Sequence, residues 1–288
     1  MIKHYLKVAF RNLIKYKTQS LVSIIGLAVG FTCFALSVLW IRYEMTYDNF
    51  HEGADRIYLV RAHYANEPGT SKFTPYPLMK YLQDKMPEIE AVTAFTAHYV
   101  KFRMEDTEQE IGMIAADSVF MNFFDIQLLK GTVNFLKCDG QEVAITKEFA
   151  KRLFSKEEDA LGKEVEVGRR VCKIGAIVSG WSNHSNIPYN ILAPARHSPR
   201  WGSSNEQLFI RVRERTDIDV FRTKMSTIRI NDIEKESELS DLLITRMSAL
   251  RYSDYVDKSR CCYLFQLYIL FLLSRRTGDY LFVIQLFD

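Results

Sequence analysis

The longest apolar run of the chain, residues 21–41, contains no charged residue. As an α-helix its 21 residues would be about 31 Å long, close to the ~30 Å hydrocarbon core of a bilayer. A cleaved signal peptide has a shorter apolar stretch, about 7 to 15 residues, followed by small residues. This run ends instead in Trp40 and Ile41. The pattern therefore predicts an uncleaved transmembrane helix over residues 18–43.

Residues 1–17 combine two stripes at helical spacing. Apolar residues such as Leu6 and Phe10 form one, and Lys3, Lys7 and Arg11 recur every fourth residue on the other side. The pattern predicts a cytoplasmic amphipathic helix on the inner leaflet, with its basic side toward anionic lipid headgroups. The alternative is the ordinary basic flank of a signal anchor.

Charge differs across the apolar run. Basic residues dominate before it, whereas Arg42 is followed closely by Glu44, Asp48, Glu52 and Asp55. The positive-inside rule then predicts a cytoplasmic N-terminus and a main domain on the outer side of the membrane.

Residues 44–250 show short β-branched and aromatic runs mixed with amphipathic segments and no strict βαβ alternation, which predicts an α+β domain with two subdomains. Thr74 is the expected N-cap of a helix with Pro75 in its first turn, and Val220, Phe221, Met225 and Ile228 are expected to face the core from another helix. Strands are expected over 56–62, 89–104, 110–116, 142–145, 164–167, 170–178 and 208–212, and helices over 74–86, 147–154 and 217–230.

Motifs that carry enzymatic chemistry are missing from the sequence. Gly162-Lys163 lacks the earlier glycine of a nucleotide-binding loop, and no GxSxG, HExxH or CxxC pattern occurs. An acid pair of Asp48 and Asp55 is conceivable, but capping is the simpler interpretation. The Asn183–Asn186 segment has the composition of a turn. The histidines never occur at metal spacing and are expected to be surface or hydrogen-bonding residues: His51, His63, His98, His184 and His197.

We therefore expect no catalytic, cofactor-binding or metal residue and no enzyme activity. The net charge of +3 lies mostly in the N-terminal segment and the far C-terminus, so no basic surface for nucleic acid is expected. Five cysteines fit neither a zinc site nor a disulfide framework. Cys138 and Cys172 would face the oxidising side, where they form either a bridge or two free thiols.

Several segments together resemble the permease family that includes the macrolide exporter MacB and the cell-division protein FtsX, in the form with a MacB-like periplasmic core domain and closest to permeases of Bacteroidetes-type bacteria. Their order and spacing over residues 1 to about 252 carry the resemblance. The segments are Phe10–Leu13, Tyr43–His51, Ala54–Tyr58, Thr74–Leu78, Asp117–Phe120, Phe123–Asp125, Leu128–Gly131, Ala144–Lys147, Leu161–Lys163 and Ser185–Tyr189.

The resemblance implies the membrane subunit of an ABC transporter in the bacterial inner membrane, with residues 44–250 as its periplasmic core domain. Its partners would be a cytoplasmic ATPase, a second permease in a homo- or heterodimer, and a periplasmic adaptor or outer-membrane component. Closure of the ATPase would be relayed through the membrane helices to the periplasmic domains, a mechanism called mechanotransmission, and would drive export or efflux.

The tail, residues 251–288, departs from the family, whose second membrane span is expected near residue 262. The apolar segment 261–273 is short and is followed by Arg275, Arg276 and Asp279, which are costly inside a bilayer. One choice of codons from Ser274 onward, read one base later, encodes an apolar helix. We therefore hypothesise a frameshift within 258–262 that replaced the second span and truncated the protein; the alternative is a natural single-pass protein with a short apolar tail.

Two other functions remain open on the sequence. A single-pass periplasmic sensor or binding module would need no second span, and a regulator of cell-wall hydrolases would resemble FtsX.

Overall fold

The computed structural model describes residues 4, 11, 13–64, 69–104, 107–137, 141–154, 156–181, 184–228 and 239–250. These residues fall into two compact units, 1–46 and 47–288. Most of the predicted amphipathic helix, Cys138 and the tail 251–288 lie outside the described residues. The expectations for the surface helix, the cysteine bridge and the tail therefore stay predictions.

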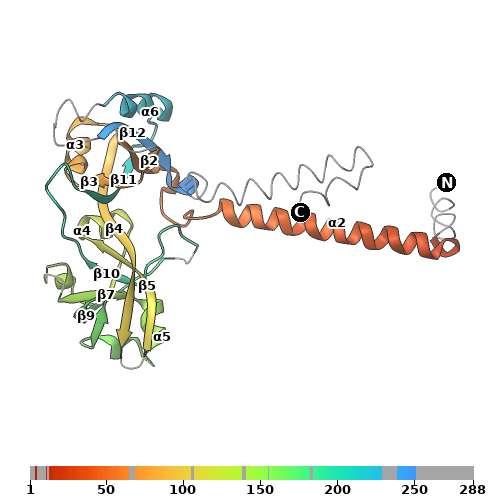
Figure 1. Cartoon of the computed structure of the whole chain (residues 1–288), viewed down its shortest axis with the longest axis horizontal. Coiled ribbons are helices and arrows are strands. Elements are labelled where there is room, and N and C mark those ends of the chain that lie inside the picture. The colour runs from red at the N-terminus through yellow and green to blue at the C-terminus, as the bar shows by residue number, and fades with distance from the viewer. Residues whose placement is uncertain are drawn as a thin grey trace. The chain divides into compact units, whose positions relative to one another are not determined.

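The first unit contains helix α2, Lys17–Met45, drawn in red-orange in Figure 1. Within the described residues it is the one helix long and apolar enough to cross a membrane. Two of its hydroxyl groups are satisfied within the helix, since Thr32 Oγ1 donates to the Ala28 carbonyl at 2.8 Å and Ser37 Oγ to that of Cys33 at 2.8 Å. Such bonds lower the cost of placing a hydroxyl in hydrocarbon. The helix ends at Met45, with Thr46 as its C-cap.

The second unit is a mixed α/β domain. Its strands are β1 Ile57–Tyr64, β2 Thr70–Ser71, β3 Thr74–Pro75, β4 Ile89–Met104, β5 Thr107–Ala116, β6 Leu128–Gly131, β7 Glu142–Thr146, β8 Glu164–Val167, β9 Arg170–Val178, β10 Ile191–Pro194, β11 Ser204–Val212 and β12 Leu239–Arg246. Its helices are α3 Pro77–Lys85, α4 Ser118–Phe123, α5 Lys147–Leu153 and α6 Ile218–Ser226, with short 3-10 turns η1 Ala54–Arg56, η2 Val133–Leu136, η3 Glu157–Ala160 and η4 Met247–Ala249.

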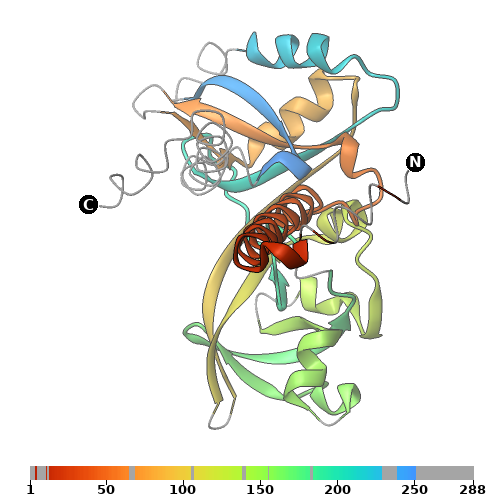
Figure 2. The ribbon, with the colours of Figure 1, turned by 90° about the vertical axis from the view of Figure 1, so that its right-hand side faces the viewer.

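Strand β4 joins the two parts of this domain. Its first half, residues 89–95, pairs with β11, and Phe95 lies opposite Gln207. Its second half, residues 96–104, pairs with β5, and Thr96 lies opposite Ala115. The main path of described strands has the order β12-β1-β11-β4-β5-β10-β7-β9-β6, and beside it β2 pairs with β1, β3 with β11, and β8 with β4 and β9. Figures 1 and 2 show β4 running from the part that carries α3 and α6 to the part that carries α5.

Three clusters of buried apolar residues match this division. One packs α3 and α6 on β1, β11 and β12, with Phe221 and Leu82 at its centre. Another packs α5 on β7 and β9 around Phe149 and Ile177. The third, around Phe95 and Phe120, contains residues of both parts and of α4. The predicted α+β class with two subdomains is therefore confirmed.

Several expected elements are confirmed, including the β8–β9 hairpin and the helix that starts after Thr146, whose Oγ1 accepts a hydrogen bond from Phe149 N at 3.3 Å. The helix expected from Thr74 starts later. Thr74 and Pro75 form β3 against β11, and α3 starts at Pro77. Of the two prolines, Pro75 and Pro77, it is Pro77 that occupies the first helical turn.

Two other expectations need correction. Val220 was expected in the core, but its side chain is 64% exposed, and only Phe221 and Met225 of α6 are fully buried. Strands β10 and β12 were not expected at all. β10 has four residues and β12 has eight, and both pair with strands distant in the sequence, β10 with β5 and β12 with β1.

Candidate functional site

Asp48 is the centre of a buried polar cluster. The residue is fully buried, and its backbone adopts a left-handed conformation with φ of 58°. Its carboxylate accepts a hydrogen bond from Ser185 Oγ at 2.5 Å and another from Asn186 Nδ2 at 2.6 Å. Asn186 N donates to the same carboxylate at 3.2 Å, and Asp48 N donates to the His184 carbonyl at 3.2 Å. We call this cluster, Asp48 with residues 184–186, the Asp48 latch.

The loop side of the latch is shaped by its own turn. Ser185 Oγ, besides donating to Asp48, accepts a hydrogen bond from Ile187 N at 3.1 Å. A serine that bonds the backbone two residues ahead fixes a local turn. The turn presents the serine hydroxyl, the asparagine amide and one backbone N–H to a single carboxylate, so the carboxylate holds the loop by four donor–acceptor pairs.

Aromatic rings surround the latch. The Tyr47 ring lies 3.9 Å from that of His184. His51 lies among Phe50, Phe124 and Trp181, with ring centroids 4.2, 5.1 and 4.8 Å away. The indole of Trp181 donates to the Ile187 carbonyl at 3.0 Å, which connects these rings to the latch loop. The segment 47–51 is thus anchored by packing as well as by hydrogen bonds.

Burial dominates the electrostatics of the site. Burial raises the pKa of the Asp48 carboxyl above its ordinary value, and the hydrogen bonds from Ser185 and Asn186 offset part of that rise. Burial, and to a smaller extent the positive charge of Arg211, lowers the pKa of His51 to about 4. His51 is therefore a neutral ring in the folded protein near pH 7, packed like an aromatic core residue.

The fold places two segments in contact that are distant in the sequence and were interpreted separately. Asp48 was expected to cap a helix and the Asn183–Asn186 segment to be a simple turn. Instead the turn residues Ser185 and Asn186, 137 and 138 positions further along the chain, bind the Asp48 side chain. Both segments belong to the stretches that carry the family resemblance, and their shared presence there was the one signal that could have linked them. Asp55, the other residue of the conceived pair, lies in η1.

The remaining histidines are distributed as surface or hydrogen-bonding residues. His98 is exposed on β4, and Ser240 Oγ donates to the His63 carbonyl at 2.9 Å. His197 lies 3.2 Å from a carboxylate oxygen of Glu206 and stacks on Tyr76 at 4.0 Å. His51 and His197 are the exceptions, because both rings are largely buried, His51 among aromatic rings and His197 with 11% of its side chain exposed. Among the described residues, no group of three or more His, Cys, Asp or Glu side chains could hold a metal ion.

The family model of the MacB-like periplasmic core domain matches residues 20–228, which is more than half of the chain. The chain belongs to the MacB-like periplasmic core domain family. The match includes α2 from residue 20 onward and both halves of the Asp48 latch. No curated protein matches the chain.

One solved structure shows the fold of this domain, and two others are less similar to the chain. A domain of a protein assigned as a permease in Porphyromonas gingivalis superposes with a TM-score of 0.55 at 18% identity, over 68% of this chain and 91% of that one. The extracellular domain of the noncanonic ABC-type transporter YknZ from Gram-positive bacteria has a TM-score of 0.48 at 14% identity, over 66% of this chain and 99% of that one. The periplasmic region of MacB from Actinobacillus actinomycetemcomitans has a TM-score of 0.49 at 13% identity, over 69% of this chain and 92% of that one. The first likeness shows the fold.

Proposed function

We propose that this chain is the membrane subunit of an ABC transporter of the MacB/FtsX type, and that it relays motion from a cytoplasmic ATPase to its periplasmic core domain. Membership in the family supports the transporter class. The subunit itself carries out no chemistry in this proposal. It pairs with a second permease subunit, works with a periplasmic adaptor or outer-membrane component, and drives export from the periplasm across the outer envelope.

The observation that carries the proposal is the position of Asp48 in the chain. Helix α2 ends at Met45, and Thr46 and Tyr47 follow before the buried, hydrogen-bonded Asp48. A displacement of α2 along its axis must pass through this covalent connection. Because the Asp48 carboxylate binds Ser185 and Asn186, the displacement would reach a loop far along the chain and, through Trp181 and Ile187, the aromatic core of the domain.

The proposed orientation places the N-terminus in the cytoplasm and residues 44–250 outside the inner membrane. The basic residues before α2 and the acidic residues after it support this topology through the positive-inside rule. The ATPase would then act at the cytoplasmic side on residues 1–17, at the surface of the inner leaflet.

A binding experiment tests the proposal. The full chain is co-expressed with the ATPase encoded beside its gene, and the membranes are solubilised and purified through a tag on the chain. We expect a stoichiometric complex whose ATP hydrolysis rate differs from that of the ATPase alone. If the ATPase does not bind, and a ligand instead raises the thermal stability of the full chain, the protein is a single-pass binding module and the transporter proposal is wrong.

For the tail, we propose that residues from about 258 onward replace the second membrane span through a frameshift. The arginines and aspartate after the apolar segment 261–273 support this proposal, because a spanning helix excludes them. DNA sequencing of codons 255–300 tests it. We expect further apolar spans in the shifted frame, and an immediate stop codon in that frame would contradict the idea.

A further inference from the structure

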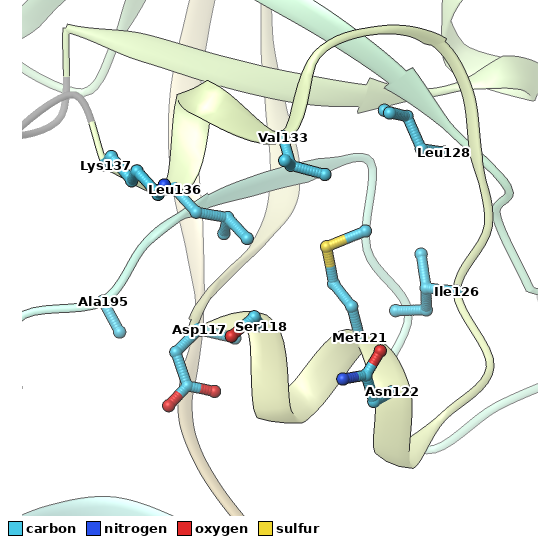
Figure 3. A pocket seen from close by; sticks show the side chains of 11 residues that line it. Asp117, Ser118, Met121, Asn122, Ile126, Leu128, Val133, Leu136, Lys137 and Ala195 are labelled. Carbon is cyan, nitrogen blue, oxygen red and sulfur yellow. The ribbon is translucent and has the colours of Figure 1, made fainter.

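A cavity of about 410 Å³ lies between α4 and η2, away from the Asp48 latch. Its walls are apolar and come from three segments. Met121 belongs to α4, Ile126 and Leu128 to the segment that leads into β6, and Val133 and Leu136 to η2. Figure 3 shows the side chains of Met121 and Leu136 directed toward each other across this space. The volume falls in the range of small-molecule sites, about 300 to 1,000 Å³.

One end of the cavity is polar. Asp117, the N-cap of α4, and Ser118 of α4 lie at this end, and Lys137 follows η2. Figure 3 shows Asn122 apart from them, on the side of Ile126. Asp117 is held in place, because its Oδ1 accepts a hydrogen bond from Phe120 N at 3.1 Å. Its side chain keeps 32% of its surface exposed, and Figure 3 shows its carboxylate at the opposite end of the cavity from Leu128. The cavity therefore has an apolar interior and a fixed negative charge at one end.

Part of the apolar wall faces water. Val133 is 47% exposed and Leu128 is 37% exposed, although both line the cavity. Each exposed apolar side chain forgoes the free energy that burial supplies, about 25 cal/mol per Å². A ligand that covers these two side chains while filling the space beside Met121 and Leu136 recovers that free energy, so the lining favours an alkyl chain.

We propose that this cavity binds a single-chain amphiphile, with its alkyl chain among Met121, Leu128, Val133 and Leu136 and a protonated amine in its head beside Asp117. The charge at the polar end argues for the amine, since a cation pairs with the fixed carboxylate and a carboxylate head is repelled by it. Lys137 at the same end is exposed on a long flexible stem and gives a weaker preference. The site stands independently of the proposed transport function.

Photolabelling tests the proposal on the full chain in phosphatidylcholine nanodiscs. The probe is a dodecylamine that carries a diazirine on its alkyl chain, and a diazirine fatty acid of the same length serves for comparison. After irradiation, proteolysis and mass spectrometry locate the adducts. We expect amine adducts in segment 118–137, and about tenfold less labelling in Leu136→Trp and in Val133→Trp, because the indole fills the cavity. Each factor of ten corresponds to about 1.4 kcal/mol of binding free energy.

Two further variants separate the ligand class from general effects. Val171→Trp adds an indole at an exposed position of β9 and should leave labelling unchanged. Asp117→Asn keeps a good N-cap for α4 but removes the charge, so it should lower labelling by the amine and not by the fatty acid. Thermal unfolding of each variant confirms folding, and Val133→Trp keeps the test decisive if Leu136→Trp fails to fold, because Val133 is half exposed.

Three outcomes would overturn the proposal. Amine adducts found exclusively outside segment 118–137 would indicate general partitioning into the membrane. Labelling unchanged in a folded cavity-filling variant would show that the cavity is not the site. Stronger labelling by the fatty acid than by the amine would show that the head group is assigned wrongly.

Discussion

Asp48 and Ser185 lie 137 positions apart in the sequence and share a 2.5 Å hydrogen bond inside the folded domain. The bond closes a loop of the chain between the exit of α2 and a turn next to the aromatic core. Because Asn186 binds the same carboxylate, removal of Asp48 leaves more than one buried donor without its acceptor. The latch is therefore both a stability element and a tertiary anchor close after Met45.

Asp48→Ala should lower the free energy of unfolding by about 2 to 4 kcal/mol. It removes charge-assisted hydrogen bonds, and it places alanine at φ of 58°, a left-handed conformation that alanine rarely adopts. Asp48→Asn tolerates the left-handed backbone and should lose less. Denaturant unfolding followed by tryptophan fluorescence measures the change. Glu52→Gln, an exposed acid close by, should stay within about 0.5 kcal/mol of the parent.

A double-mutant cycle isolates the bond itself. Asp48→Ala and Ser185→Ala, alone and together, should give a coupling energy of about 1 to 2 kcal/mol. A coupling energy near zero would mean that the two residues are neighbours without energetic dependence, and the latch would then be a packing feature only.

Acid should destabilise the protein through His51. The pKa of His51 in the folded state, about 4, lies below the ordinary value of 6.5. At pH values between the two, His51 is therefore protonated to a greater extent in the unfolded state than in the folded state. Stability attributable to His51 is therefore lost as the pH falls from 6.5 toward 4, by at most about 3.5 kcal/mol at about 1.4 kcal/mol per pKa unit. Asp48 acts in the opposite direction, since its raised pKa favours proton uptake by the folded state at low pH.

His51→Phe should flatten this pH dependence, because phenylalanine suits the aromatic surroundings and does not titrate. Unfolding curves at pH 7 and pH 4.5 give the difference between the variant and the parent, which removes the contribution of Asp48. His98→Phe, at an exposed position, should keep the slope of the parent. Equal slopes in all three proteins would show that His51 is not shielded from protons.

Gly131 should tolerate no side chain. Its φ is +84°, and a Cβ at this position would collide with the Gly175 carbonyl oxygen of the paired strand β9. Gly131→Ala should therefore cost about 2 kcal/mol or more, from backbone strain and steric overlap together. Gly168→Ala provides the matched comparison, since Gly168 has φ of +65° but open space around its Cβ position. Its cost should be the strain alone, about 1 kcal/mol.

The sequence predicted the parts of the fold that depend on local chemistry. The hairpin at Gly168, the cap at Thr146 and the long strand from Ile89 all follow from turn residues, side-chain hydrogen bonds and β-branched runs. Val220 shows the limit of periodicity, because α6 is covered on one narrow stripe only and this apolar residue lies outside it. Strand β10 shows another limit, because its pairing with β5 is set by the tertiary structure.

The latch could not be predicted from either of its segments alone. Residues 183–186 have turn composition for backbone reasons, and Asp48 follows an apolar helix, where caps are common. Only the fold places the carboxylate opposite the serine and the asparagine. The sequence did indicate that both segments matter, since each belongs to the stretches that resemble the permease family.

The most direct test of the transmission proposal is hydrogen–deuterium exchange at residues 184–189 in the complex of the full chain with its ATPase. The complex is compared in nanodiscs with and without ATP, using an ATPase variant that binds but does not hydrolyse the nucleotide. We predict that ATP changes the exchange rate of this loop in the parent and that Asp48→Ala, which removes the acceptor, abolishes the change while ATP binding persists. Identical exchange with and without ATP in the parent, or a change that survives in folded Asp48→Ala, would contradict the account.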